Sequence, residues 1–250
     1  MDGSVTLNVS NSIGTIEFYH PKSNSLPKAL LHSLAETISK AGSNSEITVV
    51  ILKSSGDGAF CAGASFDELL GINDLEAGKR FFSGFGKVIL AMKRCPKLII
   101  TRVHGKTVGG GVGIVAASDY AIASENASIK LSELSVGIGP FVIAPVVERK
   151  IGVSALSSLS INATEWRTAE WAYQKGLYND VVTSTSDLDE AVLTLADKLS
   201  GYNPKAMEKL KRALWDNTDH METLLENRAE VTGRLALSSF TKNFIEKFKN

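Results

Sequence analysis

The 250-residue sequence predicts an α/β fold that continues into an all-helical C-terminal region. Short apolar runs of the kind that form buried strands alternate with amphipathic helical patterns as far as about residue 183. Beyond that point only helical patterns occur, and no low-complexity linker separates the two parts. We therefore expect a core formed by residues 1–185 and a helical region formed by residues 186–250, which packs on this core or on that of a neighbouring subunit.

The spacing of the apolar residues places each predicted element. Strict alternation predicts one strand near residues 5–9 and another near residues 13–18, with Gly14 close to the turn. Further strands are expected where apolar residues run together, at residues 47–52, 97–103, 120–123, 127–131 and 181–182. Helices are expected over residues 27–42, from Phe66, over 76–93, from the glycine run to Ala117, over 168–175, from a cap at Ser186, from Pro204, and over 219–248.

Composition and charge argue against several classes of protein. Lysine and arginine together number 27, as do aspartate and glutamate, so a nucleic-acid partner held by general attraction to phosphate is not expected. No apolar run is long enough to cross a bilayer, and the first residues lack the pattern of a signal or transit peptide. Two cysteines, Cys61 and Cys95, do not make a disulfide framework. We expect a cytoplasmic protein without a membrane partner.

Residues 58–65, with the sequence GAFCAGAS, form the first candidate site. Small side chains allow a ligand to approach the backbone closely, and the helix predicted to follow would direct its free N–H groups outward. A surface turn with a tight packing contact would have the same composition.

Residues 108–113, with the sequence VGGGVG, form the second candidate site. They follow a buried strand and begin a short helix, whose N-terminus offers unpaired N–H donors and a positive dipole end. A phosphate loop would require a glycine at position 100, where Ile100 stands. Gly111, Gly113 and Ala116 fit a dinucleotide-binding fingerprint only formally, because they lie well beyond the end of the strand. The chain contains no Gly-x-Ser-x-Gly motif, which argues against a serine hydrolase.

Glu133 is the third candidate. It lies between Leu131 and Leu134, just after a predicted strand. Most glutamates in such a place are exposed to solvent. A partly desolvated carboxylate, by contrast, is able to accept and return a proton at carbon.

In their order and spacing, these three segments resemble those of the crotonase superfamily, also called the enoyl-CoA hydratase/isomerase superfamily. The resemblance covers essentially the whole chain. It implies a spiral of ββα units with a helical C-terminal region used in trimer formation, and trimers that can pair into hexamers. It also implies an acyl-CoA substrate and an enolate intermediate stabilised by two backbone N–H donors.

The resemblance assigns roles to single residues. The two donors would be the N–H groups of Cys61 and Gly110, and Glu133 falls on the second catalytic glutamate of the family. One preorganised donor of this kind contributes roughly 3–4 kcal/mol to the stability of an oxyanion. The positions implied in binding CoA or substrate are Ala59, Ala62, Ala64, Ser65, Gly109 and Gly113, with Phe66 and Val108 lining the acyl tunnel.

The sequence departs from the family pattern at Gly113, where many hydratases carry a second glutamate. A single carboxylate suits an enoyl-CoA isomerase, which moves a proton between two carbons, or an acyl-CoA decarboxylase, which protonates an enolate. Residues 132–147 nevertheless resemble the corresponding segment of bacterial methylglutaconyl-CoA hydratases. The sequence therefore favours a hydratase-like enzyme, with the isomerase or decarboxylase as the alternative.

Two other classes stay open at the level of sequence. One is a nucleotide-dependent enzyme that uses the glycine run, and the other is a non-catalytic crotonase-fold protein that binds CoA or RNA. No metal is expected, because the four histidines lack the spacing of ligands. No cofactor is expected either, apart from the coenzyme A that forms part of the substrate.

Overall fold

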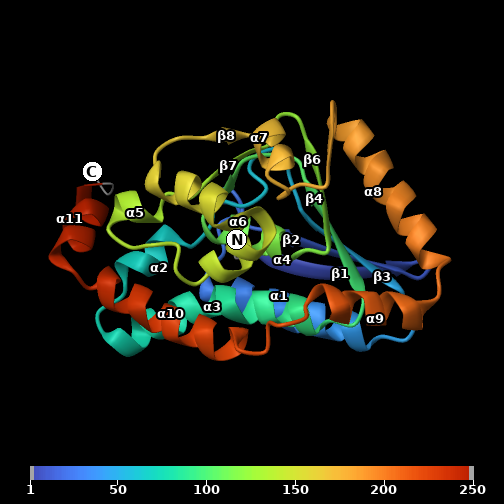
Figure 1. Ribbon diagram of the computed structural model, residues 1–250. Helices are drawn as coiled ribbons and strands as arrows, with labels where there is room; N and C mark the ends of the chain where they lie inside the picture. The colour runs from blue at the N-terminus through green and yellow to red at the C-terminus, as the bar shows by residue number, and fades with distance from the viewer. Residues whose placement is uncertain (1–2, 248–250) are drawn as a thin grey trace.

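The larger of two β-sheets has the strand order β1-β2-β3-β4-β6-β9 in the computed structural model, which describes residues 3–247 (Figure 1). Its first two strands pair antiparallel, and every later pairing in this sheet is parallel. The strands are β1 (Ser4–Ser10), β2 (Ile13–Tyr19), β3 (Val49–Ser54), β4 (Leu98–Val103), β6 (Tyr120–Ser124) and β9 (Asp180–Val182).

Helices cover both faces of this sheet, as the continuous apolar strands require. Val50 and Leu52 of β3 belong to the main core with α1 (Lys28–Ser43) and α3 (Leu75–Arg94), whereas Val49 and Ile51 pack in a second cluster with α8 (Thr185–Ser200). The remaining helices are α2 (Phe66–Leu70), α4 (Gly110–Ala117), α5 (Glu133–Val136), α6 (Ala144–Ile161), α7 (Ala169–Gln174), α9 (Pro204–Leu214), α10 (Met221–Ala236) and α11 (Ser239–Lys247).

A smaller sheet contains β5 (Thr107–Val108), β7 (Ser128–Lys130) and β8 (Arg167–Thr168). Strand β5 pairs parallel with β7, and an isolated bridge joins Thr107 of β5 to Cys61. These pairings bring together the two glycine-rich segments and the chain that leads into Glu133. The three candidate sites of the sequence therefore lie side by side.

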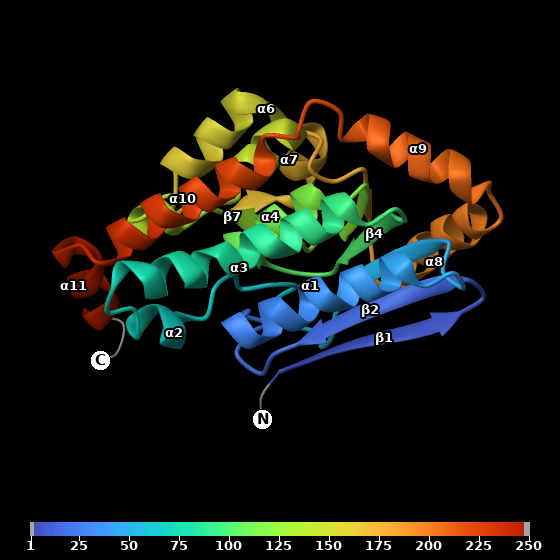
Figure 2. The same cartoon turned by 90° about the horizontal axis from the view of Figure 1, so that it is seen from below.

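The C-terminal helices pack on the core of the same chain. In Figure 2, α10 runs along α3 and continues into α11 at the same end of the molecule as α2. Helices α10 and α3 approach each other closely at two glycines, since a Cβ atom on Gly78 would lie 2.8 Å from the Cα of Gly233. This approach brings α10 near the glycine-rich segments.

The predicted α/β order and the helical C-terminal region are confirmed. The turn between β1 and β2 lies at Asn11 and Ser12, which have positive φ angles, close to Gly14 as predicted. One cap is corrected: helix α8 is capped by Ser184, whose hydroxyl accepts the Asp187 N–H, and not by Ser186. Helix α6 and the short elements β5, α5 and β8 were not predicted. The boundary at residue 185 remains a prediction, and α8, which begins there, packs against the larger sheet.

None of the helices within residues 3–247 combines the length and the apolar character that a membrane crossing requires.

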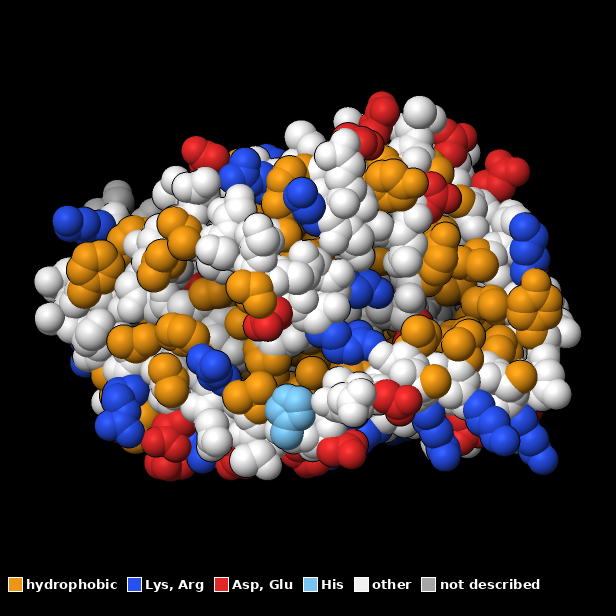
Figure 3. Space-filling model, in the orientation of Figure 1, with side chains coloured by type: hydrophobic (Ala, Val, Ile, Leu, Met, Phe, Trp, Pro, Cys, Tyr) orange, Lys and Arg blue, Asp and Glu red, His pale blue; other side chains and the backbone are white. Residues whose placement is uncertain are grey.

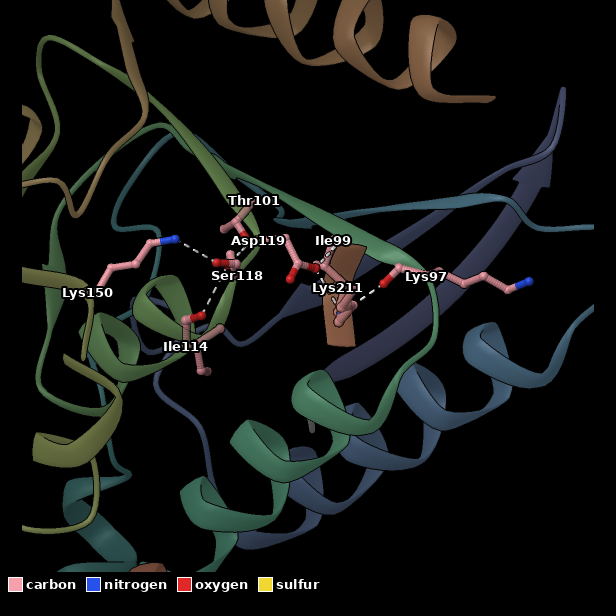
Figure 4. A network of polar contacts seen from close by, with 8 residues as sticks. All are labelled: Lys97, Ile99, Thr101, Ile114, Ser118, Asp119, Lys150 and Lys211. Carbon is pink, nitrogen blue, oxygen red and sulfur yellow. Dashed lines mark hydrogen bonds and ion pairs between the residues drawn. The ribbon is translucent and has the colours of Figure 1, made fainter. Parts of the chain in front are cut away.

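A buried polar network joins helix α9 to the N-terminal ends of β4 and β6 (Figure 4). The ammonium of Lys211 lies 2.8 Å from an Asp119 carboxylate oxygen and donates to the Lys97 carbonyl at 2.8 Å. The same Asp119 oxygen accepts the Ile99 N–H at 2.8 Å. Both side chains of the ion pair are almost completely buried, at 2% exposure for Lys211 and 5% for Asp119. Lys150 donates separately to the Ser118 carbonyl, at the end of α4.

Replacement of Lys211 by Met is expected to lower the free energy of unfolding by about 3–5 kcal/mol, because Asp119 would be left as an uncompensated buried charge. In the double variant Lys211→Met/Asp119→Asn, the free energy of unfolding should fall by less than the sum of its decreases in the two single variants. Urea denaturation measures these differences. Lys209→Met on the exposed face of α9 is the control, expected within about 0.5 kcal/mol of the wild type. Equal effects of Lys211→Met and the control would contradict this account of the network.

Candidate active site

A cavity of about 160 Å³ lies where the two glycine-rich segments, α3, α5 and α10 meet. Its wall is mostly apolar, as is usual for a small-molecule site. The lining residues are Ala62, Gly63, Ala64, Phe66, Leu69, Phe82, Phe85, Val108, Gly109, Gly110, Ser132, Glu133, Val136, Ile138, Gly139, Pro140, Val142, Ile143 and Thr232.

The second glycine-rich segment begins α4 at the wall of this cavity. Gly109 caps the helix with a φ of +54°, a conformation that favours glycine. Gly110 is the first helical residue, so its N–H has no partner within the helix. A Cβ atom on Gly110 would lie 2.1 Å from the Phe85 ring, which packs directly on the backbone there. The first residues of the helix are glycines without side chains of their own, and this N-terminus faces the cavity.

The first glycine-rich segment lies against the second. Gly63 has a φ of +83°, and a Cβ atom there would be 2.9 Å from the Val108 carbonyl oxygen and 3.7 Å from the Gly110 nitrogen. The Gly63 carbonyl accepts the Leu26 N–H at 2.8 Å, which fixes this segment to the core. Across residues 3–247, no acceptor is bonded to the N–H of Ala64, the next residue in the cavity wall. Two amides without internal partners, those of Ala64 and Gly110, thus belong to adjacent segments of the wall.

The structure contradicts the assignment of Cys61 as a free donor. Its N–H donates to the Lys106 carbonyl at 3.2 Å, in the bridge to β5, and the residue is fully buried outside the cavity wall. The sequence alone could not show that this amide is used in a strand-like pairing. Burial raises the pKa of the Cys61 thiol to about 12, which agrees with a packing role for the side chain.

Glu133 is the first residue of α5 and places its carboxylate in the cavity wall. A Cβ atom on Gly109 would lie 2.8 Å from Glu133 Oε1, so the carboxylate sits directly against the glycine run. Its Oε2 atom is buried and has no hydrogen-bond partner among the residues described. Burial raises the pKa of Glu133 to about 7, against the opposing effect of its own backbone N–H. Near neutral pH this carboxyl can therefore both accept and give a proton.

Gly113 does not line the cavity, contrary to its predicted place among the substrate-binding residues. The Ile143 side chain fills the space above it, and a Cβ atom on Gly113 would lie 2.4 Å from Ile143 Cγ2. At Gly113, where many hydratases carry a second glutamate, the space that a side chain would need is thus occupied by the hydrocarbon side chain of Ile143.

The other predicted residues divide into two groups. The cavity wall includes Ala62, Ala64, Phe66, Val108 and Gly109. Ala59 and Ser65 lie outside the wall: the Ala59 carbonyl accepts the Asn24 side-chain amide at 2.9 Å, and the Ser65 hydroxyl caps α2. Their predicted contacts with CoA remain predictions. No signal in the sequence placed α10, Val136, Ile138 or Val142 in the wall, because only the fold brings them to the glycine run.

Within the part of the chain that the structure describes, no three His, Cys, Asp or Glu side chains are grouped as they would be to hold a metal ion.

The sequence profile of the enoyl-CoA hydratase/isomerase family matches residues 8–247. The chain belongs to this family. A relative of this enoyl-CoA hydratase/isomerase is the short-chain-enoyl-CoA hydratase of Clostridium acetobutylicum, with 29% identity over 99% of this chain and 98% of the relative. Another is the peroxisomal Δ(3,5)-Δ(2,4)-dienoyl-CoA isomerase of Arabidopsis thaliana, with 26% identity over 76% and 72% of the two chains.

Solved structures show the same fold. The crystal structure of enoyl-CoA hydratase from Bacillus halodurans superimposes with a TM-score of 0.91 and 22% identity, covering 97% of this chain and 99% of the other. The crystal structure of enoyl-CoA hydratase from Bacillus anthracis superimposes with a TM-score of 0.79 and 27% identity, covering 90% of this chain and 88% of the other. The protein is thus an enzyme of the hydratase/isomerase family with the crotonase fold.

Gly113→Ala is expected to lower the free energy of unfolding by about 1–3 kcal/mol, because the new methyl group would overlap Ile143. The same change in an Ile143→Ala background should cost less, since the space is then free. Gly58→Ala serves as the control, because no atom lies within 4 Å of a Cβ there. Additive effects of the changes at positions 113 and 143 would contradict the proposed packing.

The raised pKa of Glu133 also predicts a pH-dependent stability. Between about pH 4.5 and 7 the folded protein holds a proton on Glu133 that the unfolded chain has lost, so this group makes folding less favourable as the pH rises. The free energy of unfolding of Glu133→Gln should therefore rise relative to that of the wild type across this window, by roughly 2–3 kcal/mol at the upper end. Urea denaturation at pH 5 and pH 8 measures the gain, and an equal difference at the two pH values would contradict the burial argument.

Proposed function

We propose that the cavity binds the thioester of an acyl-CoA, stabilises its enolate through the N–H groups of Ala64 and Gly110, and uses Glu133 to carry a proton. The observation that carries the proposal is the position of one buried carboxyl against the same glycine run that offers a free backbone donor. Removal of a proton from the carbon next to a thioester places negative charge on the carbonyl oxygen. Donors that are fixed before the reaction stabilise this charge without having to reorganise.

The reaction best supported by this arrangement is isomerisation of an enoyl-CoA. Glu133 would remove a proton from C2 of a 3-enoyl thioester, and the electron pair of that C–H bond would form a C1–C2 double bond as negative charge moves to the carbonyl oxygen. The electron pair of the C3–C4 double bond would then take the same proton at C4 from Glu133. In that step the C1–C2 pair forms the C2–C3 double bond, the carbonyl re-forms, and Glu133 returns to the carboxylate. One carboxyl with a pKa of about 7 suffices for both steps. The hydrocarbon contact between Ile143 and Gly113 leaves no place for a second carboxylate.

Hydration of a 2-enoyl-CoA is the second candidate. It is favoured by the relative from Clostridium acetobutylicum, which is named a short-chain-enoyl-CoA hydratase and aligns over nearly the whole of both chains. In this protein Glu133 alone would have to direct the water and return the proton. Methylglutaconyl-CoA hydration stays a prediction from the resemblance, as do acyl-CoA decarboxylation and a non-catalytic role in CoA or RNA binding.

We further expect a homotrimer or a dimer of trimers in the cytoplasm, with no cofactor beyond the CoA of the substrate. Helices α8 and α9 expose Leu193, Leu210 and Leu214, each more than 45% accessible. Hydrophobic side chains gather in this region on the right of the molecule in Figure 3. Such a surface supports contact with another subunit.

Deuterium exchange at the acyl carbon next to the thioester tests the proposed function. In heavy water, with a panel of 2-enoyl-, 3-enoyl- and saturated acyl-CoAs, the wild type should catalyse exchange, and Glu133→Gln should reduce its rate at least about 100-fold. The rate should rise with pH through a midpoint near 7, because the base must be ionised. Mass spectrometry detects the exchange and separates isomerised from hydrated or decarboxylated products.

Glu125→Gln is the matched control, since Glu125 is exposed in the turn after β6 and is expected to leave the rate unchanged. No exchange with any substrate, or exchange that survives in Glu133→Gln, would contradict the proposed function.

A further inference from the structure

The wall of the active-site cavity carries no positive charge. Of the residues that line it, only Glu133 is ionisable, and only Ser132 and Thr232 add polar side chains. Every other lining residue is a glycine, an alanine, a proline or a larger apolar residue. A carboxylate on the far end of an acyl chain would therefore enter an apolar space, without a cation to pair with and close to Glu133. Such a buried, unpaired charge is strongly disfavoured.

Thr232 is the residue that α10 contributes to this wall. It is 2% exposed, and its hydroxyl donates to the Arg228 carbonyl at 2.9 Å. The hydroxyl is thus satisfied inside its own helix and does not require a polar partner on the substrate. The contact between Gly78 and Gly233 holds this turn of α10 close to α3, whose Phe82 also lines the cavity.

The cations of α3 and α10 near this turn are engaged elsewhere. Arg234, two residues after Thr232, pairs with Glu230 at 3.2 Å and lies outside the cavity wall. Arg228, one turn before Thr232, lies over the Phe141 ring at 5.9 Å and lines a separate cleft together with Glu148 and Asp216. Lys79, which follows Gly78 on α3, pairs with Glu226 at 3.2 Å. Neither residue belongs to the cavity wall.

We infer that the enzyme selects uncharged aliphatic acyl groups and rejects those with a distal carboxylate, because the cavity wall, including the turn of α10 at Thr232, supplies no cation. The inference rests on the proposed function, because it assumes that the acyl chain occupies this cavity. It disfavours methylglutaconyl-CoA, which carries a second carboxyl group, as the substrate.

A matched pair of thioesters tests the inference. Hex-3-enoyl-CoA and hex-3-enedioyl-CoA have the same chain and differ at C6, where one has a methyl group and the other a carboxylate. We expect kcat/KM for the dicarboxylic thioester to be at least about 100-fold lower. The saturated analogues hexanoyl-CoA and adipoyl-CoA should show a similar ratio of Kd by calorimetry. Comparable values for the two members of either pair would overturn the inference.

Substitutions in the wall then locate the preference. Thr232→Lys should raise the relative kcat/KM for hex-3-enedioyl-CoA at least about 10-fold by supplying the missing cation. The near-isosteric Thr232→Val should keep the wild-type preference, and so should Arg228→Met. If Thr232→Lys fails to fold, Leu69→Lys introduces a cation into the same wall from α2. An unchanged preference in a folded lysine variant would overturn the role of the wall. A stronger rejection of the dicarboxylic thioester by Arg228→Met would show that Arg228 reaches the acyl chain, and would overturn the inference that no cation does.

The calorimetric pair separates failure of the inference from failure of the proposed function. Absence of exchange and turnover with every substrate would contradict the proposed function, whereas the ratio of the two dissociation constants would still test the selectivity of the cavity. Turnover of both thioesters at similar rates, lost in Glu133→Gln, would uphold the proposed function and refute the selectivity.

Discussion

The close approach of two stretches of backbone is the constraint on which the site depends. Gly63 lies so near the Val108 carbonyl that no side chain fits between them, and the Phe85 ring covers Gly110 in the same way. Glycine at these positions lets one segment present the Ala64 amide beside the free N-terminus of α4. The pairing of β5 with β7, and the bridge from Thr107 to Cys61, hold the two segments in register.

A second consequence of this packing is the environment of Glu133. The carboxylate lies against Gly109, so a side chain there would displace it, and its burial moves its pKa to about 7. The apolar wall that raises the pKa is also the wall that an acyl chain would touch. Ile143 is part of this wall, and its side chain also fills the space above Gly113. The same hydrocarbon surface therefore tunes the single carboxyl, excludes a second one, and limits the charge that a substrate can carry.

Much of the fold followed from local patterns in the sequence, whereas the site needed the tertiary structure. Continuous apolar runs predicted β3 and β4 because both faces of these strands are covered. Helix α6 was missed because Pro145 stands near its start and Gly152, with a φ of +75°, interrupts it, so no regular apolar stripe is visible. The family resemblance placed Glu133 and Gly110 in the cavity wall, but it assigned the first donor to Cys61, whose amide is taken by Lys106. Thr232 had no signal in the sequence, because only the packing of α10 on α3 brings it to the site.

The central claim is that a thioester carbonyl lies between the amides of Ala64 and Gly110, with the carbon next to it facing Glu133. A crystal structure with a bound, unreactive acyl-CoA analogue measures this most directly. We expect the carbonyl oxygen to accept hydrogen bonds from both nitrogens at about 2.7–3.1 Å, with the Cys61 amide still bonded to Lys106. A carbonyl oxygen placed away from these two amides, or one that has displaced Lys106 from the Cys61 N–H, would contradict it.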